Sequence, residues 1–203
     1  MLIQNKNDPF DRLRVIVSKI ESMKIVLIGI QGAGKSTQGN LLSKKLKIPY
    51  LSTGHIFREL SKEKTKLGRY VKEVMNAGYL IPDRKTVSIV AEYLKRSEYK
   101  DGYIIDGFPR TLNQVKFFKN GADKVVYLKV SDEEALKRLN FRNGEGREDE
   151  NPKAVAKRIE SFHRFTEPVL DYYREKGMLI EVDGEKTIED IYNEILRKIN
   201  GNQ

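Results

Sequence analysis

One stretch of eight residues constrains the fold of this 203-residue chain more than any other feature. Residues 29–36 read Gly-Ile-Gln-Gly-Ala-Gly-Lys-Ser and fit the pattern G-x-x-x-x-G-K-[ST] without exception. The stretch follows the apolar run 25–28 and opens a helical pattern over 35–46, which is the context that the motif requires. Its glycines allow close backbone approach, so successive N–H groups and the helix N-terminus can face a phosphate. We therefore predict a loop that binds a nucleoside triphosphate.

Two side chains of this loop have separate expected roles. Lys35 can reach the β- and γ-phosphates, and the Ser36 hydroxyl can be a ligand of Mg²⁺. A glycine-rich turn without function is the alternative, and the strand, the spacing and the lysine together argue against it. The expected contacts to the triphosphate come from Gly32, Ala33, Gly34, Lys35, Ser36 and Thr37. The motif alone does not reveal the phosphate acceptor.

The rest of the chain alternates apolar, β-branched runs with helical patterns. Buried strands are predicted at 25–28, 103–105, 125–128 and 179–182, with a shorter one at 49–52. Helices are predicted over 35–46, 85–96, 112–118, 132–141, 151–175 and 188–199. This alternation indicates an α/β fold of three layers, a five-stranded parallel sheet with helices on both faces. Ligands of such sheets bind outside the carboxyl ends of the strands.

Composition excludes several classes of protein. The absence of cysteine rules out a disulfide scaffold, a thiolate nucleophile and a cysteine zinc site. No apolar run approaches the roughly 20 residues that a membrane-spanning helix needs. The length suits one domain with inserts. We expect a monomer in a reducing compartment, the cytoplasm, with no membrane partner.

The formal net charge of +9 points to an anionic partner. Nucleic acid, anionic lipid and phosphorylated small molecules all fit such a charge. The chain lacks interleaved aromatic residues or an RNA-binding motif, so we expect no nucleic-acid partner. A nucleotide-responsive binder of RNA or DNA is kept as an alternative, and it predicts an affinity that falls steeply with salt.

The first 22 residues differ in pattern from the rest of the chain. Residues 10, 13, 17 and 20 are apolar at helical spacing, so a short docked helix and a loose tail are both open. Met23 stands directly before the first predicted strand and is an alternative start. We expect residues 1–22 to be an extension of unknown role, which the domain formed by residues 23–203 does not need for its activity.

Five segments, in order across residues 23–203, resemble the adenylate kinases, a family of nucleoside monophosphate kinases. They are 29–38, 52–58, 78–83, 106–111 with Gln114, and 138–158. The string Asp-Gly-Phe-Pro-Arg at 106–110 is highly specific for that family. The resemblance implies a P-loop nucleoside triphosphate hydrolase-like fold with a helical AMP-binding insert at 52–81 and a short lid at 141–151. It also implies reversible transfer of a phosphoryl group from MgATP to AMP, giving two ADP, by direct in-line attack of the AMP phosphate.

The same resemblance assigns residues to two nucleotide sites. On the ATP side it adds Arg138, Arg142 and the backbone near Lys186, and Asp149 would anchor the closed lid. The cations expected at the transferred phosphate are Lys35, Arg110, Arg142, Arg147 and Arg158. The AMP contacts are Thr53, Arg58, Tyr79, Leu80, Ile81, Gly107, Phe108, Pro109, Arg110, Gln114, Arg147 and Arg158. Arg58 and Arg110 would grip the AMP phosphate, and Gln114 would read the adenine edge.

The chemistry explains why arginines gather in such a site. A phosphate of the AMP type is mostly ionised at pH 7, so the nucleophile needs no general base. The site must neutralise charge and hold the attacking and leaving oxygens in line. Asp106, expected just after the strand 103–105, can hold a water of the Mg²⁺ shell, and a solvated turn aspartate is the alternative. Without cysteine and with a short lid, we expect magnesium and no zinc.

Some positions bear on substrate choice or depart from the family. Thr53 favours AMP, because related UMP/CMP kinases usually carry alanine there. A UMP/CMP kinase or a kinase that uses GTP stays the alternative. Thr53 could also cap the next helix. His55 stands where aspartate is usual, and Ser36 where glycine is typical. Gly39 lies inside a predicted helix at a cost of roughly 1 kcal/mol against alanine. Close packing against the sheet would explain it.

Overall fold

Five parallel strands form the central sheet of the computed structural model, which describes residues 22–118, 121–141 and 151–201. The strands are β1 (Lys24–Ile28), β2 (Tyr50–Ser52), β3 (Tyr103–Asp106), β4 (Lys124–Lys129) and β5 (Leu179–Asp183). They lie in the order β2-β3-β1-β4-β5, and every neighbouring pair is parallel. The five predicted strands are thereby confirmed.

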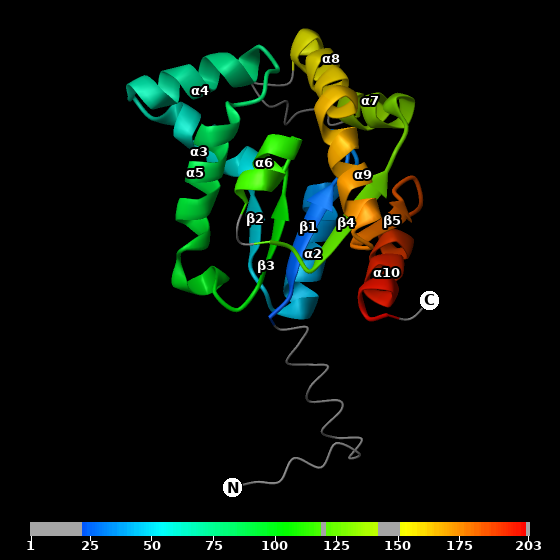
Figure 1. The fold of residues 1–203 in the computed structure, drawn as a ribbon. Helices are drawn as coiled ribbons and strands as arrows, with labels where there is room; N and C mark the ends of the chain where they lie inside the picture. The colour runs from blue at the N-terminus through cyan, green and yellow to red at the C-terminus, as the bar shows by residue number, and fades with distance from the viewer. Residues whose placement is uncertain (1–21, 119–120, 142–150, 202–203) are drawn as a thin grey trace, which may run out of the picture.

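Helices connect the strands and cover both faces of the sheet. They are α2 (Lys35–Leu46), α3 (Thr53–Lys62), α4 (Lys66–Asn76), α5 (Asp83–Leu94), α6 (Leu112–Phe117), α7 (Asp132–Asn140), α8 (Pro152–Ser161), α9 (Glu167–Glu175) and α10 (Ile188–Ile199), with a 3₁₀ turn η1 (Ser97–Tyr99). Helices α2 and α10 pack together behind the sheet, whereas α5, α6 and α9 lie on its other face (Figure 1). The predicted three-layer α/β architecture is confirmed.

The central strands are buried on both faces, which explains their continuous apolar sequences. Ile25, Val26 and Leu27 of β1 have no exposed surface, and neither do Ile104 and Ile105 of the neighbouring β3. A parallel sheet covered by helices has no polar face, so strict alternation of polar and apolar residues is not expected. Across the described residues, no helix is long and apolar enough to cross a membrane.

The register of the sheet brings three strand ends together. Leu27 of β1 pairs with Asp106 of β3, and Ser52 of β2 also pairs with Asp106. Above these ends, α3 and α4 stand on one side and α7 and α8 on the other (Figure 1). The loops that leave β1, β2 and β3 therefore open into the space between two helical arms.

The predicted single helix over 151–175 is wrong in one respect. Helix α8 ends at Ser161, a π-helical segment η2 (Phe162–Thr166) follows, and α9 begins at Glu167. Pro168 accounts for the interruption, because proline has no N–H and its ring clashes with the carbonyl four residues earlier. A wider π turn before Pro168 accommodates this ring while the chain stays helical.

Several expectations lie outside the described residues. They are the helix or tail in residues 1–21, most of the lid, and the side chains of Arg142, Arg147 and Asp149. The helical insert corresponds to α3 and α4, which fill most of residues 53–76. Its boundaries, those of the lid and the role of the first 22 residues stay predictions.

His163, in the π segment, joins the starts of two helices. Its Nδ1 lies 2.7 Å from Oε1 of Glu167 in α9, and its Nε2 lies 3.0 Å from Oδ1 of Asp132 in α7. The hydrogen bond with Glu167 is the largest cause of a raised pKa of His163, burial opposes it, and Asp132 raises the pKa further. The protonated imidazole therefore bridges two carboxylates.

We expect His163→Gln to lower stability more at acid than at alkaline pH. Because the pKa of His163 is raised in the folded state, its contribution is fully present below the unfolded pKa of about 6.5 and is lost as pH rises through the folded pKa. The site is well exposed, so the difference should stay within about 1 kcal/mol. Urea unfolding of both proteins at pH 5.5 and pH 9 measures it. A difference that is the same at both pH values would contradict the bridge.

Candidate functional site

A cavity of about 350 Å³ opens at the carboxyl ends of β1, β2 and β3. Its walls come from the phosphate loop, the start of α3, the segment after α4, the loop after β3 and the helical stretch α8–η2. The predicted site residues that line it are Gly32, Gly34, Lys35, Ser36, Thr53, Arg58, Tyr79, Leu80, Ile81, Asp106, Gly107, Phe108, Pro109, Arg110, Gln114 and Arg158. Segments far apart in the sequence thus meet in one place, as the motifs predict.

The loop after β1 has the backbone that its glycines allow. Gly34, with φ of 84°, caps α2, and Gly32 has φ of 93°. A Cβ at Gly32 would lie only 2.7 Å from the backbone oxygen of Ala135 in α7, so both conformation and space require glycine there. The first turn of α2 has no acidic residue. Its unbonded N–H groups and positive helix end therefore favour an anion in the cavity.

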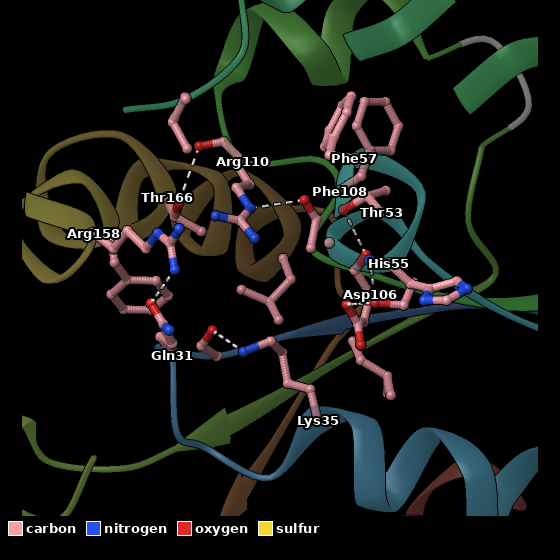
Figure 2. A pocket seen from close by; sticks show the side chains of 18 of the residues that line it. Gln31, Lys35, Thr53, His55, Phe57, Asp106, Phe108, Arg110, Arg158 and Thr166 are labelled. Carbon is pink, nitrogen blue, oxygen red and sulfur yellow. Dashed lines mark hydrogen bonds between the residues drawn. The ribbon is translucent and has the colours of Figure 1, made fainter. Parts of the chain in front are cut away.

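Lys35 lies across this loop. Its Nζ donates to the backbone oxygen of Gly29 at 2.7 Å and to that of Ile30 at 2.8 Å. In Figure 2 the ammonium group lies below the guanidinium groups of Arg110 and Arg158, on the opposite side of the cavity. These two acceptors are neutral carbonyls, which hold the ammonium group without cancelling its charge.

Two arginines form the opposite wall. Arg110 Nε donates to the Gly107 oxygen at 2.8 Å, whereas Arg158 donates to Gln31 Oε1 at 3.2 Å and to the Met75 oxygen at 3.0 Å. Burial lowers the pKa of Arg110, and the positive charge of Arg158 lowers it further. The charged form of a group whose pKa is lowered in this way is stabilised when an anion comes close. The wall therefore favours a bound phosphate.

The charges around the cavity are unequal. Among the described lining residues, Lys35, Arg58, Arg110 and Arg158 are cations and Asp106 is the one carboxylate. Like charges held together in a partly enclosed space repel one another. A phosphorylated ligand would relieve that repulsion, so the cavity is suited to polyanions.

Asp106 is the last residue of β3, not the first residue after it, and it is 5% exposed. Its carboxylate accepts hydrogen bonds from Tyr50 Oη and from Ser52 Oγ, the latter at 3.2 Å. A solvated turn aspartate is thereby excluded. The Asp106 carboxylate and the Ser36 hydroxyl line the same cavity, and both are hard oxygen groups of the kind that Mg²⁺ prefers. These residues fit a magnesium ion that keeps part of its water shell.

Thr53 does not cap the helix that follows β2. Ser52 is the N-cap of α3, because its Oγ accepts from the backbone N–H of His55 at 3.4 Å. Thr53 is the first helical residue, is 1% exposed, and donates from Oγ1 to the backbone oxygen of Asp106 at 3.0 Å. Its hydroxyl therefore joins the start of α3 to the end of β3. His55 lines the cavity from the same turn.

Gln114 is held firmly at the cavity wall. It is 1% exposed, its Oε1 accepts from the Arg110 N–H at 2.7 Å, and its Nε2 donates to Asp83 Oδ1 at 2.9 Å. Since Asp83 can only accept, this pair fixes which end of the amide is oxygen and which is nitrogen. One N–H of the amide stays available for another acceptor.

Four predicted contacts lie away from the cavity lining. Arg138 donates to Glu134 and to the Gly184 oxygen, and Lys186 donates to Glu194 of α10. Both side chains therefore gather near the turn after β5. In the phosphate loop, Ala33 is buried and Thr37 is exposed, and neither is part of the cavity wall.

Sequence reasoning missed several residues of the wall. Gln31 and Met75 bond Arg158, Tyr50 bonds Asp106, and Thr166 donates from Oγ1 to the Arg110 oxygen at 3.0 Å. Tyr50 had a usable signal, because it stands two residues before Ser52 and so shares its strand face. Thr166 had no such sequence signal, since the direction of its side chain depends on the π segment.

Comparison with known proteins agrees with this geometry. The family model described as adenylate kinase matches residues 27–178. An adenylate kinase of Caldicellulosiruptor bescii is 35% identical over 212 residues, which cover 87% of this chain and 99% of the relative. One of Staphylococcus aureus is 36% identical over 209 residues, covering 86% and 97%. One of Acetivibrio thermocellus is 35% identical over 214 residues, covering 88% and 99%.

We expect tripolyphosphate to stabilise the protein through the cationic wall. At 100 times its Kd, a ligand adds about 2.7 kcal/mol, which corresponds to a Tm increase of about 5–10 °C for a chain of this size. Arg110→Met should reduce that increase strongly, whereas Arg197→Met, at an exposed position of α10, should not. Thermal unfolding with and without tripolyphosphate measures both. Equal increases in the two variants would show that the anion binds elsewhere.

Proposed function

The chain belongs to the adenylate kinase family, and from that membership we propose how its own residues perform the family's reaction. It is an enzyme that converts ATP and AMP reversibly into two ADP. Enzymes of the family generally use ATP as its magnesium complex. The observation that carries the assignment of residues is the excess of cations around a cavity at the ends of β1 and β3.

On the ATP side, the loop between β1 and α2 would hold the β- and γ-phosphates. Backbone N–H groups at the start of α2 would face them, and Lys35 would exchange its carbonyl partners for phosphate oxygens. Ser36 and, through water, Asp106 would hold magnesium, which neutralises charge on the transferred group when bound. Arg138 and the backbone near Lys186 would contact the rest of ATP, beside the turn at Gly184.

On the AMP side, Arg58 and Arg110 would bind the phosphate. Thr53 and the segment Tyr79, Leu80 and Ile81 would border the nucleoside, together with the loop of Gly107, Phe108 and Pro109. Gln114 would read the adenine edge with the N–H that its bond to Asp83 leaves available. A planar guanidinium suits a phosphate because it can donate two parallel hydrogen bonds.

The reaction needs orientation and charge more than proton transfer. The AMP phosphate oxygen is already ionised, so it attacks the γ-phosphorus of ATP directly while the bond to the β-phosphate oxygen breaks. Arg110, Arg158 and Lys35 approach the cavity from different elements and would stabilise the charge that spreads over the transferred group. Arg142 and Arg147 are proposed to join them, with Asp149 anchoring the lid.

Other attributes stay predictions of the same proposal. We expect a monomer that acts in the cytoplasm, binds no nucleic acid and needs no zinc. The chain has no cysteine, which is consistent with the last of these.

Lys35→Met should lower kcat about 100-fold to 1000-fold, because one preorganised positive donor at the transferred phosphate is lost. A coupled assay of ADP formed from ATP and AMP measures it. Lys44→Met changes an exposed lysine of the same helix and should leave kcat within about twofold. Folded Lys35→Met enzyme with unchanged turnover would refute the role of this loop.

AMP should be preferred over CMP and UMP by about tenfold or more in kcat/KM. A polar side chain that is placed to hydrogen-bond one base loses its partner when a different base binds, and this loss lowers kcat/KM. The measurement is kcat/KM with AMP, CMP and UMP as acceptors. It is repeated with Thr53→Ala, which should reduce the ratio of kcat/KM for AMP to that for CMP or UMP, and with GTP in place of ATP as the donor. A higher kcat/KM for CMP than for AMP would overturn the argument from Thr53.

A further inference from the structure

We propose that Tyr50 is a positioning residue for Asp106 and that Gly39 provides the space that lets it act. The inference rests on the proposed function in one respect, namely that Asp106 holds a water of the magnesium ion. It adds two residues, one on β2 and one on α2, that none of the motifs includes.

The sheet register places Tyr50 within reach of Asp106. Tyr50 pairs with Ile104 and Ser52 pairs with Asp106, so Tyr50 and Asp106 are diagonal neighbours on adjacent strands. Aromatic side chains can span that diagonal. Tyr50 and Ser52 share one face of β2, and they reach different oxygens: Tyr50 Oη donates to Oδ2 and Ser52 Oγ donates to Oδ1.

These two donors determine the orientation of the carboxylate. An ionised carboxylate only accepts hydrogen bonds, so the phenol must be the donor. Each oxygen has about two acceptor positions, and one on each oxygen is left for water. With a donor on both oxygens the carboxylate cannot rotate freely. Partners of this kind behind a metal site orient the groups that face the metal.

Gly39 explains how the ring fits. A Cβ at Gly39 would lie 2.5 Å from Cε2, 2.8 Å from Cδ2 and 3.0 Å from Cζ of Tyr50. The ring therefore occupies the place of a side chain on α2, and the packing expected from Gly39 is confirmed. Gly39 lies three residues after Ser36, hence on the same side of α2. The Tyr50 ring thus lies between the helix that carries Ser36 and the strand that carries Asp106.

The test separates magnesium-dependent from magnesium-independent binding. The probe is an ATP analogue with an imido group between the β- and γ-phosphates, titrated by calorimetry with Mg²⁺ or with EDTA. For Tyr50→Phe we expect affinity with Mg²⁺ to fall about tenfold and affinity in EDTA to stay unchanged. In the assay, kcat should fall by a similar factor while the KM for AMP does not change.

Tyr103→Phe is the matched control. It removes a phenol from β3 that donates to the Gly121 oxygen at 3.0 Å, at the strand end away from Asp106. This variant should lose stability yet keep the full gain in affinity from Mg²⁺. The comparison separates a lost buried hydrogen bond from a lost orientation of Asp106.

Gly39→Ala should displace the Tyr50 ring and reduce the gain in analogue affinity that Mg²⁺ provides, as Tyr50→Phe does. Added to Tyr50→Phe it should reduce the gain no further, because the hydroxyl is already gone. Full gain in Gly39→Ala would overturn the part that concerns Gly39.

Asp106→Asn distinguishes the two levels of the proposal. If Asp106→Asn loses the gain from Mg²⁺ and Tyr50→Phe keeps it, the role of Tyr50 is refuted and the proposed function stands. If Asp106→Asn itself keeps the gain, the proposed metal role of Asp106 fails, and with it this inference. Equal losses with Mg²⁺ and with EDTA in Tyr50→Phe would show that the ring only shapes the cavity, which also refutes the positioning role.

Discussion

Repulsion between like charges is the constraint on which the site depends. Lys35, Arg110 and Arg158 converge on one partly enclosed cavity, and burial makes the charge of Arg110 more costly there. Neutral oxygens are among the partners that hold these groups, namely the carbonyls of Gly29, Ile30, Gly107 and Met75. A carbonyl orients a cation without neutralising it. Under the proposed function, two nucleotides that repel each other in water would meet in this cavity.

Much of the fold could be predicted from the sequence because its signals are local. The apolar runs at β1, β3 and β4 reflect burial on both faces of a parallel sheet, and that burial is itself dictated by the helices between them. The π segment could not be predicted in the same way. Pro168 indicates that a helix must adjust, but not whether it ends, kinks or widens, since packing against Arg110 and its loop decides that.

Site residues within local motifs could likewise be predicted, whereas those that depend on contacts between distant segments could not. Residues within motifs, such as Lys35 and Asp106, were found because their spacing to a strand end is fixed by the backbone. Tyr50 and Gln31 were missed because their roles arise from contacts between segments distant in sequence. Arg138 and Lys186 lie outside the cavity wall, Arg138 beside Gly184, and their assignment to ATP from matching motifs stays a prediction.

The contact between Gly39 and the ring of Tyr50 also limits how this lineage can change over time. An alanine at position 39 would favour the helix, yet it overlaps a ring only 2.5 Å away. A descendant that gains this methyl group must also shift the Tyr50 ring or replace it with a smaller residue. Substitutions at the two positions should therefore be correlated along a phylogeny.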